Sequence, residues 1–419
     1  GCDLMRMFIE KLEKENLLKQ INEPISVKYQ ITNYLKNTPQ SYLFNNLKET
    51  TAPGRIAANL ITTRKHLALA LDCKENELIK KISHAMNHLI KTKTIKNAPC
   101  QEHETTLNSI PIPTYFKTDG GPYITSGVVV SSDPEYGPNL SFHRIMKRED
   151  HLVIRVVQRH TWDYYERANR NLKIAICIGV EPEVLIAGAI STEENVNELE
   201  IASALKGEPI EVIKCKTSDL LVPANSEIII EGTITKDFED EGPFVDITLT
   251  PDTIRKQPKV TVHKITTRKN PIFHALLPGG YEHGTIWKTP TEAVIYKEVN
   301  KVCKCIDAYL TLGGCSRLHG VVQIIKNHPD DPKKAIDSAF KAHPSMKHVF
   351  IVDDDIDIQD PYSVEWAMAT RFQAKTDLTI FPDSEGSSLD PSTQKTGKTT
   401  KLGFDLTIKG NKPDFKRVF

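Results

Sequence analysis

Short apolar runs occupy the middle of the chain, from about residue 115 to residue 267, and they limit the possible fold more than any other feature. Runs of this length, separated by turn residues such as Tyr136-Gly137, are typical of β-strands. One helix is predicted among them, over 196–206, with Gly207 as its C-terminal stop. Many strands with few helices predict a β-barrel. The predicted strands are 127–130, 152–157, 174–180, 184–190, 227–234 and 260–265.

The two flanks of this region have a different periodicity. Before about residue 104 the pattern is mixed, with amphipathic helices predicted near the N-terminus, where Phe8, Ile9, Leu12 and Leu17 recur, and over 75–90. From about residue 289 helix and strand alternate, which predicts an α/β layer with parallel strands. Its helices are predicted at 292–303, 332–342 and 363–372, and its strands at 321–325, 349–352 and 378–381. The polar stretch 383–400 is predicted to be a loop.

The amino-acid composition argues against several classes of function for this protein. Among the 419 residues, 54 Lys and Arg balance 54 Asp and Glu, so the net basic charge expected of a nucleic-acid-binding protein is absent. The sequence contains no uncharged apolar run of about 18 residues, so no membrane segment is expected. The eight cysteines are scattered, without a disulfide framework or a Cys-x-x-Cys zinc pair. These features predict a cytoplasmic protein with reduced thiols.

One arginine and two acids are the first candidates for chemistry. Alternation along a strand puts Arg144 among apolar neighbours, where its charge is costly without a carboxylate or an anionic ligand. A structural ion pair explains Arg144 equally well. A Gly-Pro bend separates Glu241 from Asp246, and two close carboxylates shift each other's pKa, so that one can act as an acid. The bend is otherwise a solvated acidic turn, although apolar Phe244 favours an inward position.

A second group consists of possible metal ligands. Asn139, His160 and Glu198 offer an amide, an imidazole and a carboxylate, a set that suits Mn²⁺ or Mg²⁺ better than structural zinc. No local spacing joins them. The Gly-rich stretch 277–284 is either an active-site loop or a plain turn, and the carboxylates of 353–357 either bind metal or cap turns, with caps favoured.

These residues together favour decarboxylation. An arginine can hold a carboxylate, and an acid can return a proton to the carbon that loses CO₂. No side chain of the protein supplies an electron sink, so a cofactor is required.

The chain contains an ordered set of motifs that resembles the UbiD family of decarboxylases, which use prenylated FMN. In chain order the motifs are Asn139-x-Ser141-x-x-Arg144, His160, Glu198, 221–228, Glu231-Gly232, Glu241-Gly242-Pro243-Phe244-x-Asp246, 278–283, 353–357 and Lys401-x-Gly403-x-Asp405. The resemblance covers nearly the whole chain.

The resemblance implies a role for each matching residue. Asn139, His160 and Glu198 would bind a divalent ion, Mn²⁺ or Mg²⁺, that holds the cofactor phosphate, with K⁺ nearby. The implied catalytic residues are Arg144, which orients the substrate carboxylate, Glu241, which holds Arg144, and Asp246, which returns the proton. The implied contacts to prenylated FMN are Asn139, Ser141, Phe142, Arg144, Arg159, His160, Glu198 and Lys401.

The family fold implied by the resemblance agrees with the periodicity. It has an N-terminal α/β domain over 1–107, a central split β-barrel related to flavin reductases over 108–270, and a C-terminal α/β domain over 271–419 that carries an oligomerisation surface. A homo-oligomer, dimer or hexamer, is expected, with a small carboxylic acid as substrate and a flavin prenyltransferase as cofactor supplier. Neither nucleic acid nor a membrane is an expected partner.

Two positions depart from the family pattern. The family commonly has Gly where this chain has Val245, and often Gly where it has Leu249. A β-branched residue disfavours positive φ, so the turn that holds Asp246 is expected to have a different shape.

Four possibilities remain open. The short chain resembles the compact archaeal branch of the family, whose substrates include trans-anhydromevalonate 5-phosphate. The alternative within the class is an aromatic or 4-hydroxy-3-polyprenylbenzoate decarboxylase. From other classes come a flavin-dependent oxidoreductase on the same barrel and a non-catalytic scaffold.

Overall fold

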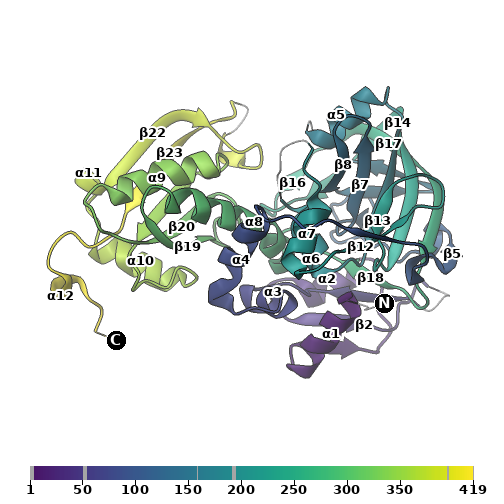
Figure 1. The fold of residues 1–419 in the computed structure, drawn as a ribbon, viewed down its shortest axis with the longest axis horizontal. Helices are drawn as coiled ribbons and strands as arrows, with labels where there is room; N and C mark the ends of the chain where they lie inside the picture. The colour runs from purple at the N-terminus through teal and green to yellow at the C-terminus, as the bar shows by residue number, and fades with distance from the viewer. Residues whose placement is uncertain (1–3, 51–53, 158, 191–194, 394–395, 419) are drawn as a thin grey trace. The chain divides into compact units, whose positions relative to one another are not determined.

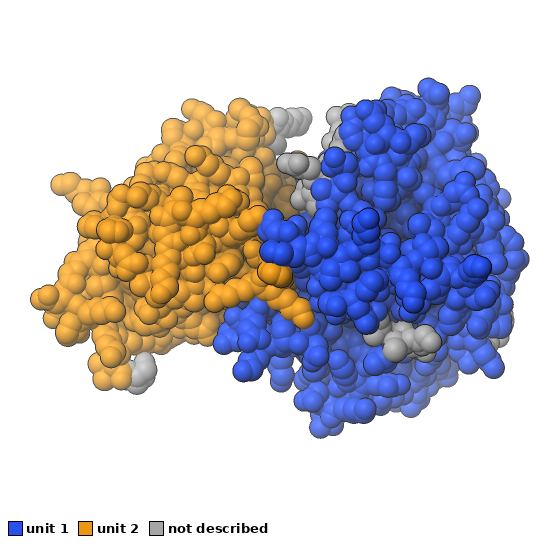
Figure 2. Space-filling view, viewed as in Figure 1, with its two compact units in different colours: residues 1–78, 85–286 blue, residues 79–84, 287–419 orange. Residues whose placement is uncertain are grey.

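The computed structural model describes residues 4–50, 54–157, 159–190, 195–393 and 396–418. Two compact units are present (Figure 2). Unit 1 comprises residues 1–78 and 85–286, and unit 2 comprises residues 79–84 and 287–419. None of the described helices is long and apolar enough to cross a membrane.

A nine-stranded antiparallel sheet forms the centre of unit 1 (Figure 1). Its strand order is β6-β9-β10-β17-β14-β11-β7-β8, with β5 paired to β17. The strands are β5 (His103–Thr105), β6 (Tyr123–Ile124), β7 (Val128–Asp133), β8 (Gly137–Phe142), β9 (Ile145–Arg148), β10 (His151–Ile154), β11 (Leu172–Ile178), β14 (Ile228–Glu241) and β17 (Arg255–Thr267). Alternate β-branched residues of these strands, such as Ile174, Ile176, Ile228 and Ile230, meet in one hydrophobic core.

Three smaller sheets and several helices complete unit 1. The N-terminal residues form a four-stranded sheet in the order β1-β2-β3-β18, whose last strand comes from beyond the large sheet in the sequence. Its strands are β1 (Leu18–Ile21), β2 (Ser41–Phe44), β3 (Arg55–Ala58) and β18 (Ile272–Ala275). The other strands are β4 (Lys93–Ile95), β12 (Glu211–Lys214) and β13 (Leu221–Pro223), which form one sheet, and β15 (Phe244–Val245) and β16 (Pro251–Asp252), which form a hairpin. The helices are α1 (Leu4–Lys14), α2 (Gln30–Leu35), α3 (Arg64–Ala70), α5 (His160–Arg167), α6 (Pro182–Gly188) and α7 (Glu198–Lys206).

Unit 2 is a five-stranded mixed sheet with helices on both faces. The strand order is β19-β20-β21-β23-β22. Val322 and Ile351 face the core that includes α9, whereas Val321 and Val352 face the core that includes α10, as alternation along a strand requires. The strands are β19 (Lys304–Leu310), β20 (His319–Ile325), β21 (His348–Val352), β22 (Leu378–Glu385) and β23 (Lys398–Asp405), and the helices are α9 (Asp331–Ala342), α10 (Pro361–Thr370), α11 (Ala374–Asp377) and α12 (Lys412–Phe415). Two helices cross the boundary between the units in the sequence, α4 (Leu78–Ala85) and α8 (Tyr281–Asn300).

The structure corrects three sequence predictions. The run 184–190 is not a strand, because it falls mostly within helix α6, which has Pro182 in its first turn and is buried along its whole length. A short run that is apolar on every side does not distinguish a buried strand from a buried helix. The sheet of unit 2 is mixed, because its edge strands β19 and β22 are antiparallel to their neighbours. Both ends of the predicted loop 383–400 belong to strands, and residues 394–395 of that stretch lie outside the described residues.

Candidate active site

Arg144 lies at the centre of a cluster of three carboxylates. It sits between strands β8 and β9, whereas Glu241 is the last residue of β14. Arg144 Nε and Nη2 donate to Glu241 Oε2 and Oε1 at 3.1 and 2.8 Å, which is a bidentate pair. Arg144 Nη1 lies 3.2 Å from Asp246 Oδ2, and Nη2 lies 3.0 Å from Asp252 Oδ2. The structure therefore brings the predicted arginine and both predicted acids together.

Aromatic residues complete the surroundings of Glu241. The carboxylate is fully buried, and its Oε2 accepts a hydrogen bond of 2.5 Å from the hydroxyl of Tyr123. The Tyr123 ring packs on Phe244, whose ring centroid lies 4.8 Å from the Arg144 guanidinium carbon. Burial opposes the charge of Arg144, but its hydrogen bonds to Glu241 and the charges of the three acids outweigh burial and raise its pKa. Arg144 is thus a permanent cation.

The turn that carries Asp246 is tied to two other loops. Val245 N donates to Asp119 Oδ1 at 3.2 Å, and Leu249 N donates to Asp246 O at 2.8 Å. A β-carbon added to Gly279 would come within 2.4 Å of Leu249 Cδ2, so the turn packs closely on the Gly-rich stretch. Asp246 itself has a 19% exposed side chain, which leaves it accessible to a ligand.

The two positions that depart from the family pattern, Val245 and Leu249, have different backbone conformations. Val245 lies in the short strand β15, where a side chain is ordinary. Leu249 adopts φ 59°, the left-handed conformation that glycine would adopt at this position. Leu249 therefore bears the strain of a left-handed residue, and the expected difference in turn shape from the family stays a prediction.

This strain makes a stability prediction. Leu249→Gly is expected to leave the free energy of unfolding within about 1 kcal/mol of the original or to raise it, because relief of the left-handed strain offsets the flexibility of glycine. Ile254→Gly is the matched control, since Ile254 is exposed nearby with an ordinary φ, and we expect it to be the more destabilising change. Urea unfolding of both variants measures the difference, and a larger loss for Leu249→Gly would contradict the argument.

Asp252 was not predicted from the sequence. It lies in β16 opposite Phe244 of β15, and this pairing carries its carboxylate back to Arg144. Its Oδ1 also binds Arg255 Nη2 at 2.5 Å. The only sequence signal for this contact is an acidic residue directly after Pro251. Strands of two residues are too short to produce an alternating apolar pattern that would predict the hairpin.

A second polar cluster lies on β8. The Asn139 amide nitrogen donates to Ser141 Oγ at 3.3 Å and to Thr161 Oγ1 at 3.2 Å. Ser141 Oγ also lies 2.8 Å from His143 Nε2. Burial lowers the pKa of His143 to about 4, so this imidazole is neutral at pH 7.

The predicted metal ligands come from three elements that meet at this cluster. Glu198, the first residue of α7, accepts a hydrogen bond of 3.0 Å from Leu140 N, next to Asn139. His160 begins α5, and its neighbour Thr161 contacts Asn139. Since the amide nitrogen of Asn139 is used within the protein, its amide oxygen is the atom left to face an ion. An amide oxygen, an imidazole and a carboxylate on converging elements fit a divalent ion.

The remaining predicted cofactor contacts divide between the units. Phe142 ends β8, and Arg159 is the N-cap residue of α5, whose own side chain makes no capping hydrogen bond. An anionic group suits such a helix start. Lys401 belongs to unit 2, where its ammonium donates to Pro344 O and lies 5.5 Å from the Phe340 ring centroid. Burial lowers the pKa of Lys401.

The other motifs have structural partners. In the Gly-rich stretch, Glu282 is buried and accepts hydrogen bonds from Leu60 N and Ile61 N at 2.9 and 2.7 Å. In the acidic stretch, Asp353 and Asp355 bind the buried guanidinium of Arg371, which is an ion-pair arrangement. Among the described residues, no group of three or more His, Cys, Asp or Glu side chains is arranged to hold a metal ion.

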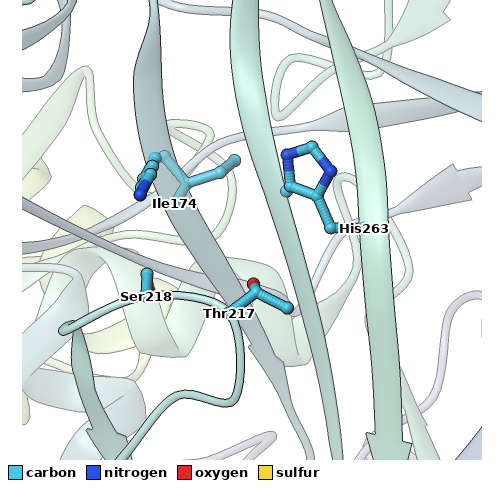
Figure 3. A pocket seen from close by; sticks show the side chains of 6 residues that line it. Ile174, Thr217, Ser218 and His263 are labelled. Carbon is cyan, nitrogen blue, oxygen red and sulfur yellow. The ribbon is translucent and has the colours of Figure 1, made fainter.

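A separate cavity lies on the large sheet, away from these residues in the sequence. It has a volume of about 330 Å³. Figure 3 shows Ile174, Thr217, Ser218 and His263 around it. None of the predicted site residues lines this cavity, so it is not the candidate active site.

Comparison with known proteins identifies the class of this fold and site. Three domain models of 3-octaprenyl-4-hydroxybenzoate carboxy-lyase match the chain: the N-terminal domain over residues 9–86, the Rift-related domain over 91–281 and the C-terminal domain over 284–406. The chain therefore belongs to the UbiD family.

Similar proteins narrow this class. The chain is 37% identical over 412 residues to the anhydromevalonate phosphate decarboxylase of Methanothermobacter thermautotrophicus, with 96% of both chains covered. It is 47% identical over 344 residues to the enzyme of the same name from Methanocaldococcus jannaschii, with 81% of this chain and 80% of the relative covered. An evolved dimeric form of the UbiD-class enzyme HmfF from Pelotomaculum thermopropionicum, in complex with prFMN, has a TM-score of 0.91 at 34% identity and covers 99% of this chain and 96% of its own.

Proposed function

We propose that the protein is a non-oxidative decarboxylase of an α,β-unsaturated carboxylic acid, and that its substrate is trans-anhydromevalonate 5-phosphate. The reaction breaks the bond between C1 and C2, releases CO₂ and gives isopentenyl phosphate, a step of a modified mevalonate pathway. The observation that carries the proposal is the buried Arg144, held bidentately by Glu241 with Asp246 beside it. The names of the two archaeal relatives support this substrate.

Each residue of the cluster has a task in this reaction. Arg144 binds the substrate carboxylate through its terminal nitrogens, as guanidinium groups bind carboxylates in proteins. Glu241 fixes the plane of the guanidinium, and the hydroxyl of Tyr123 fixes Glu241 in turn. Asp246 returns a proton to C2 after CO₂ leaves, because it lies beside Arg144 and is accessible to a ligand.

The cofactor of this reaction is prenylated FMN in our proposal. When bound, it supplies the electron sink that the side chains lack. We assign its contacts to Asn139, Ser141, Phe142, Arg144, Arg159, His160, Glu198 and Lys401. Asn139, His160 and Glu198 would bind Mn²⁺ or Mg²⁺ beside the cofactor phosphate, with K⁺ nearby. The prFMN complex of the HmfF form supports this cofactor.

The proposal extends to organisation and partners. The large antiparallel sheet is the split β-barrel that holds the cofactor, within the three-domain division 1–107, 108–270 and 271–419. A flavin prenyltransferase supplies the cofactor, and the C-terminal domain forms a homo-oligomer. The dimeric HmfF form supports an oligomer.

A panel of acids tests the substrate. We expect protein co-expressed with a flavin prenyltransferase, and supplied with Mn²⁺ and K⁺, to release CO₂ from the phosphorylated C6 enoic acid at least about 100-fold faster than from hydroxybenzoates, because a pocket that pairs polar groups of one acid rejects another. Faster turnover of hydroxybenzoates would move the assignment to the aromatic alternative. Tightly bound ordinary FMN with pyridine-nucleotide oxidation and no CO₂ release would favour the oxidoreductase.

A further inference from the structure

The guanidinium of Arg144 offers two edges to carboxylates. Glu241 occupies the edge formed by Nε and Nη2. At the terminal edge, Nη1 donates to Asp246 at 3.2 Å, while Asp252 Oδ2 lies 3.0 Å from Nη2 as an ion pair without a hydrogen bond. A substrate carboxylate that binds Arg144 bidentately needs this terminal edge, so it competes with both aspartates.

A second cation, Arg255, already binds Asp252. Its Oδ1 and Oδ2 accept from Arg255 Nη2 and Nε at 2.5 and 3.4 Å, while Oδ2 also faces Arg144. Burial favours the neutral carboxyl, but the hydrogen bond to Arg255 and the charge of Arg144 outweigh burial and lower the pKa of Asp252. Asp252 is therefore an anion shared between two arginines.

The local structure permits a small movement of Asp252. It belongs to a hairpin with only two residues in each strand, followed by the exposed side chain of Ile254. Strand β16 itself buries neither of its residues, unlike β15 with Phe244 and Val245, so this strand has low local stability. Glu241, in contrast, is fully buried and held by Tyr123.

We propose that Asp252 is a gating residue for Arg144: its Oδ2 lies against Nη2 while the site is empty, and it withdraws fully onto Arg255, which already holds Oδ1, when a carboxylate ligand binds. The inference rests on the proposed function, since it requires Arg144 to bind the substrate carboxylate. Asp252 acts through Arg144, so it is a positioning residue. The exchange keeps Asp252 paired and prevents three carboxylates from crowding with the ligand on one guanidinium.

The binding of an unreactive ligand tests the gate. The probe is the saturated counterpart of the proposed substrate, 3-methyl-5-phosphooxypentanoate, titrated calorimetrically into cofactor-loaded protein. Asp252→Asn removes the charge of one of the two competing aspartates, so we expect its Kd to fall about 5- to 10-fold, whereas Arg255→Gln leaves Asp252 against Arg144 and should raise Kd by a similar factor. The double variant should bind like Asp252→Asn, because Arg255 acts only through Asp252.

The double variant separates the gate from long-range electrostatics. If the two charges act only at a distance, their effects add and the double variant returns to the original Kd, which would overturn the proposal. A Kd that rises in both single variants would also overturn it, because it would show a merely structural role. Asp240→Asn is the matched control, since Asp240 pairs with Lys256 on the same sheet at 2.8 Å, and it should leave Kd unchanged.

Arg144→Ala distinguishes failure of the gate from failure of the proposed function. If the original protein and Arg144→Ala bind the probe equally, Arg144 does not hold the carboxylate and the proposed function fails. If only Arg144→Ala loses binding while Asp252→Asn keeps the original Kd, Arg144 binds the ligand and the gate is wrong. Equal melting temperatures of Asp252→Asn and the original protein exclude a folding defect.

Discussion

Arg144→Ala is expected to lower the rate of CO₂ release by about 10³-fold or more, because the variant loses the charged group that holds and orients the substrate carboxylate. The bound cofactor should remain, since only one of its eight proposed contacts is lost and the proposed metal ligands on β8, α5 and α7 are unchanged. Native mass spectrometry of the co-expressed variant measures the cofactor, and release of CO₂ from the phosphorylated enoic acid measures turnover.

Two further arginine variants sharpen this result. Arg148→Ala is the matched control, because Arg148 lies on the adjacent strand β9, is 38% exposed and donates to the backbone Asp240 O at 2.6 Å instead of to a carboxylate of the Arg144 cluster. We expect it to retain near-original turnover. Arg144→Lys keeps the charge but cannot bind two carboxylates through planar edges, so it should recover little activity. Turnover retained in Arg144→Ala would rule out the carboxylate-binding role.

Glu282→Ala is expected to have the largest effect on stability, a loss of about 3–5 kcal/mol in the free energy of unfolding. The carboxylate is buried and accepts from Leu60 N and Ile61 N, and His274 Nε2 lies 2.8 Å from its other oxygen. Alanine would leave these groups without their acceptor in an interior where water does not replace it. Calorimetric melting and urea unfolding measure the loss.

Glu282→Gln is the matched variant for this prediction. Its amide oxygen can still accept from the two backbone N–H groups, so only the charge and part of the contact to His274 are lost. We expect a loss of about 1–2 kcal/mol. If Glu282→Ala were no less stable than Glu282→Gln, the hydrogen bonds of the carboxylate would not be the source of its stabilising effect.

Much of the fold could be predicted because local signals agreed with tertiary structure. The helix before Gly207 is confirmed, since that glycine adopts φ 82° and ends α7. The predicted strands at 174–180 and 260–265 overlap β11 and β17. Nearly all residues of β11 are buried, whereas buried and more exposed residues alternate along part of β17. Errors arose where local signals were ambiguous, as in α6, whose uniformly apolar sequence fits either kind of element.

Part of the candidate site was predicted from the sequence. The residues that were missed reach Arg144 or Glu241 through contacts between segments that are distant in the sequence. Arg144 and Glu241 carry recognisable motifs, and their pairing follows from the fold. Asp252 contacts Arg144 only because β16 folds back on β15. The strands of this hairpin are too short for their periodicity to predict the contact. Tyr123 similarly reaches Glu241 from a two-residue strand, β6.

The four-stranded sheet that contains β1 to β3 cannot be completed until late in translation. Its strand β3 pairs with β18, which the ribosome makes only after every strand of the large sheet. Strands β1 to β3 are made earlier and therefore wait with one sheet edge unpaired until Ile272–Ala275 has left the exit tunnel. The N-terminal segment is consequently not a transferable module: a fusion or split gene that ends before β18 would release it with an open, aggregation-prone edge.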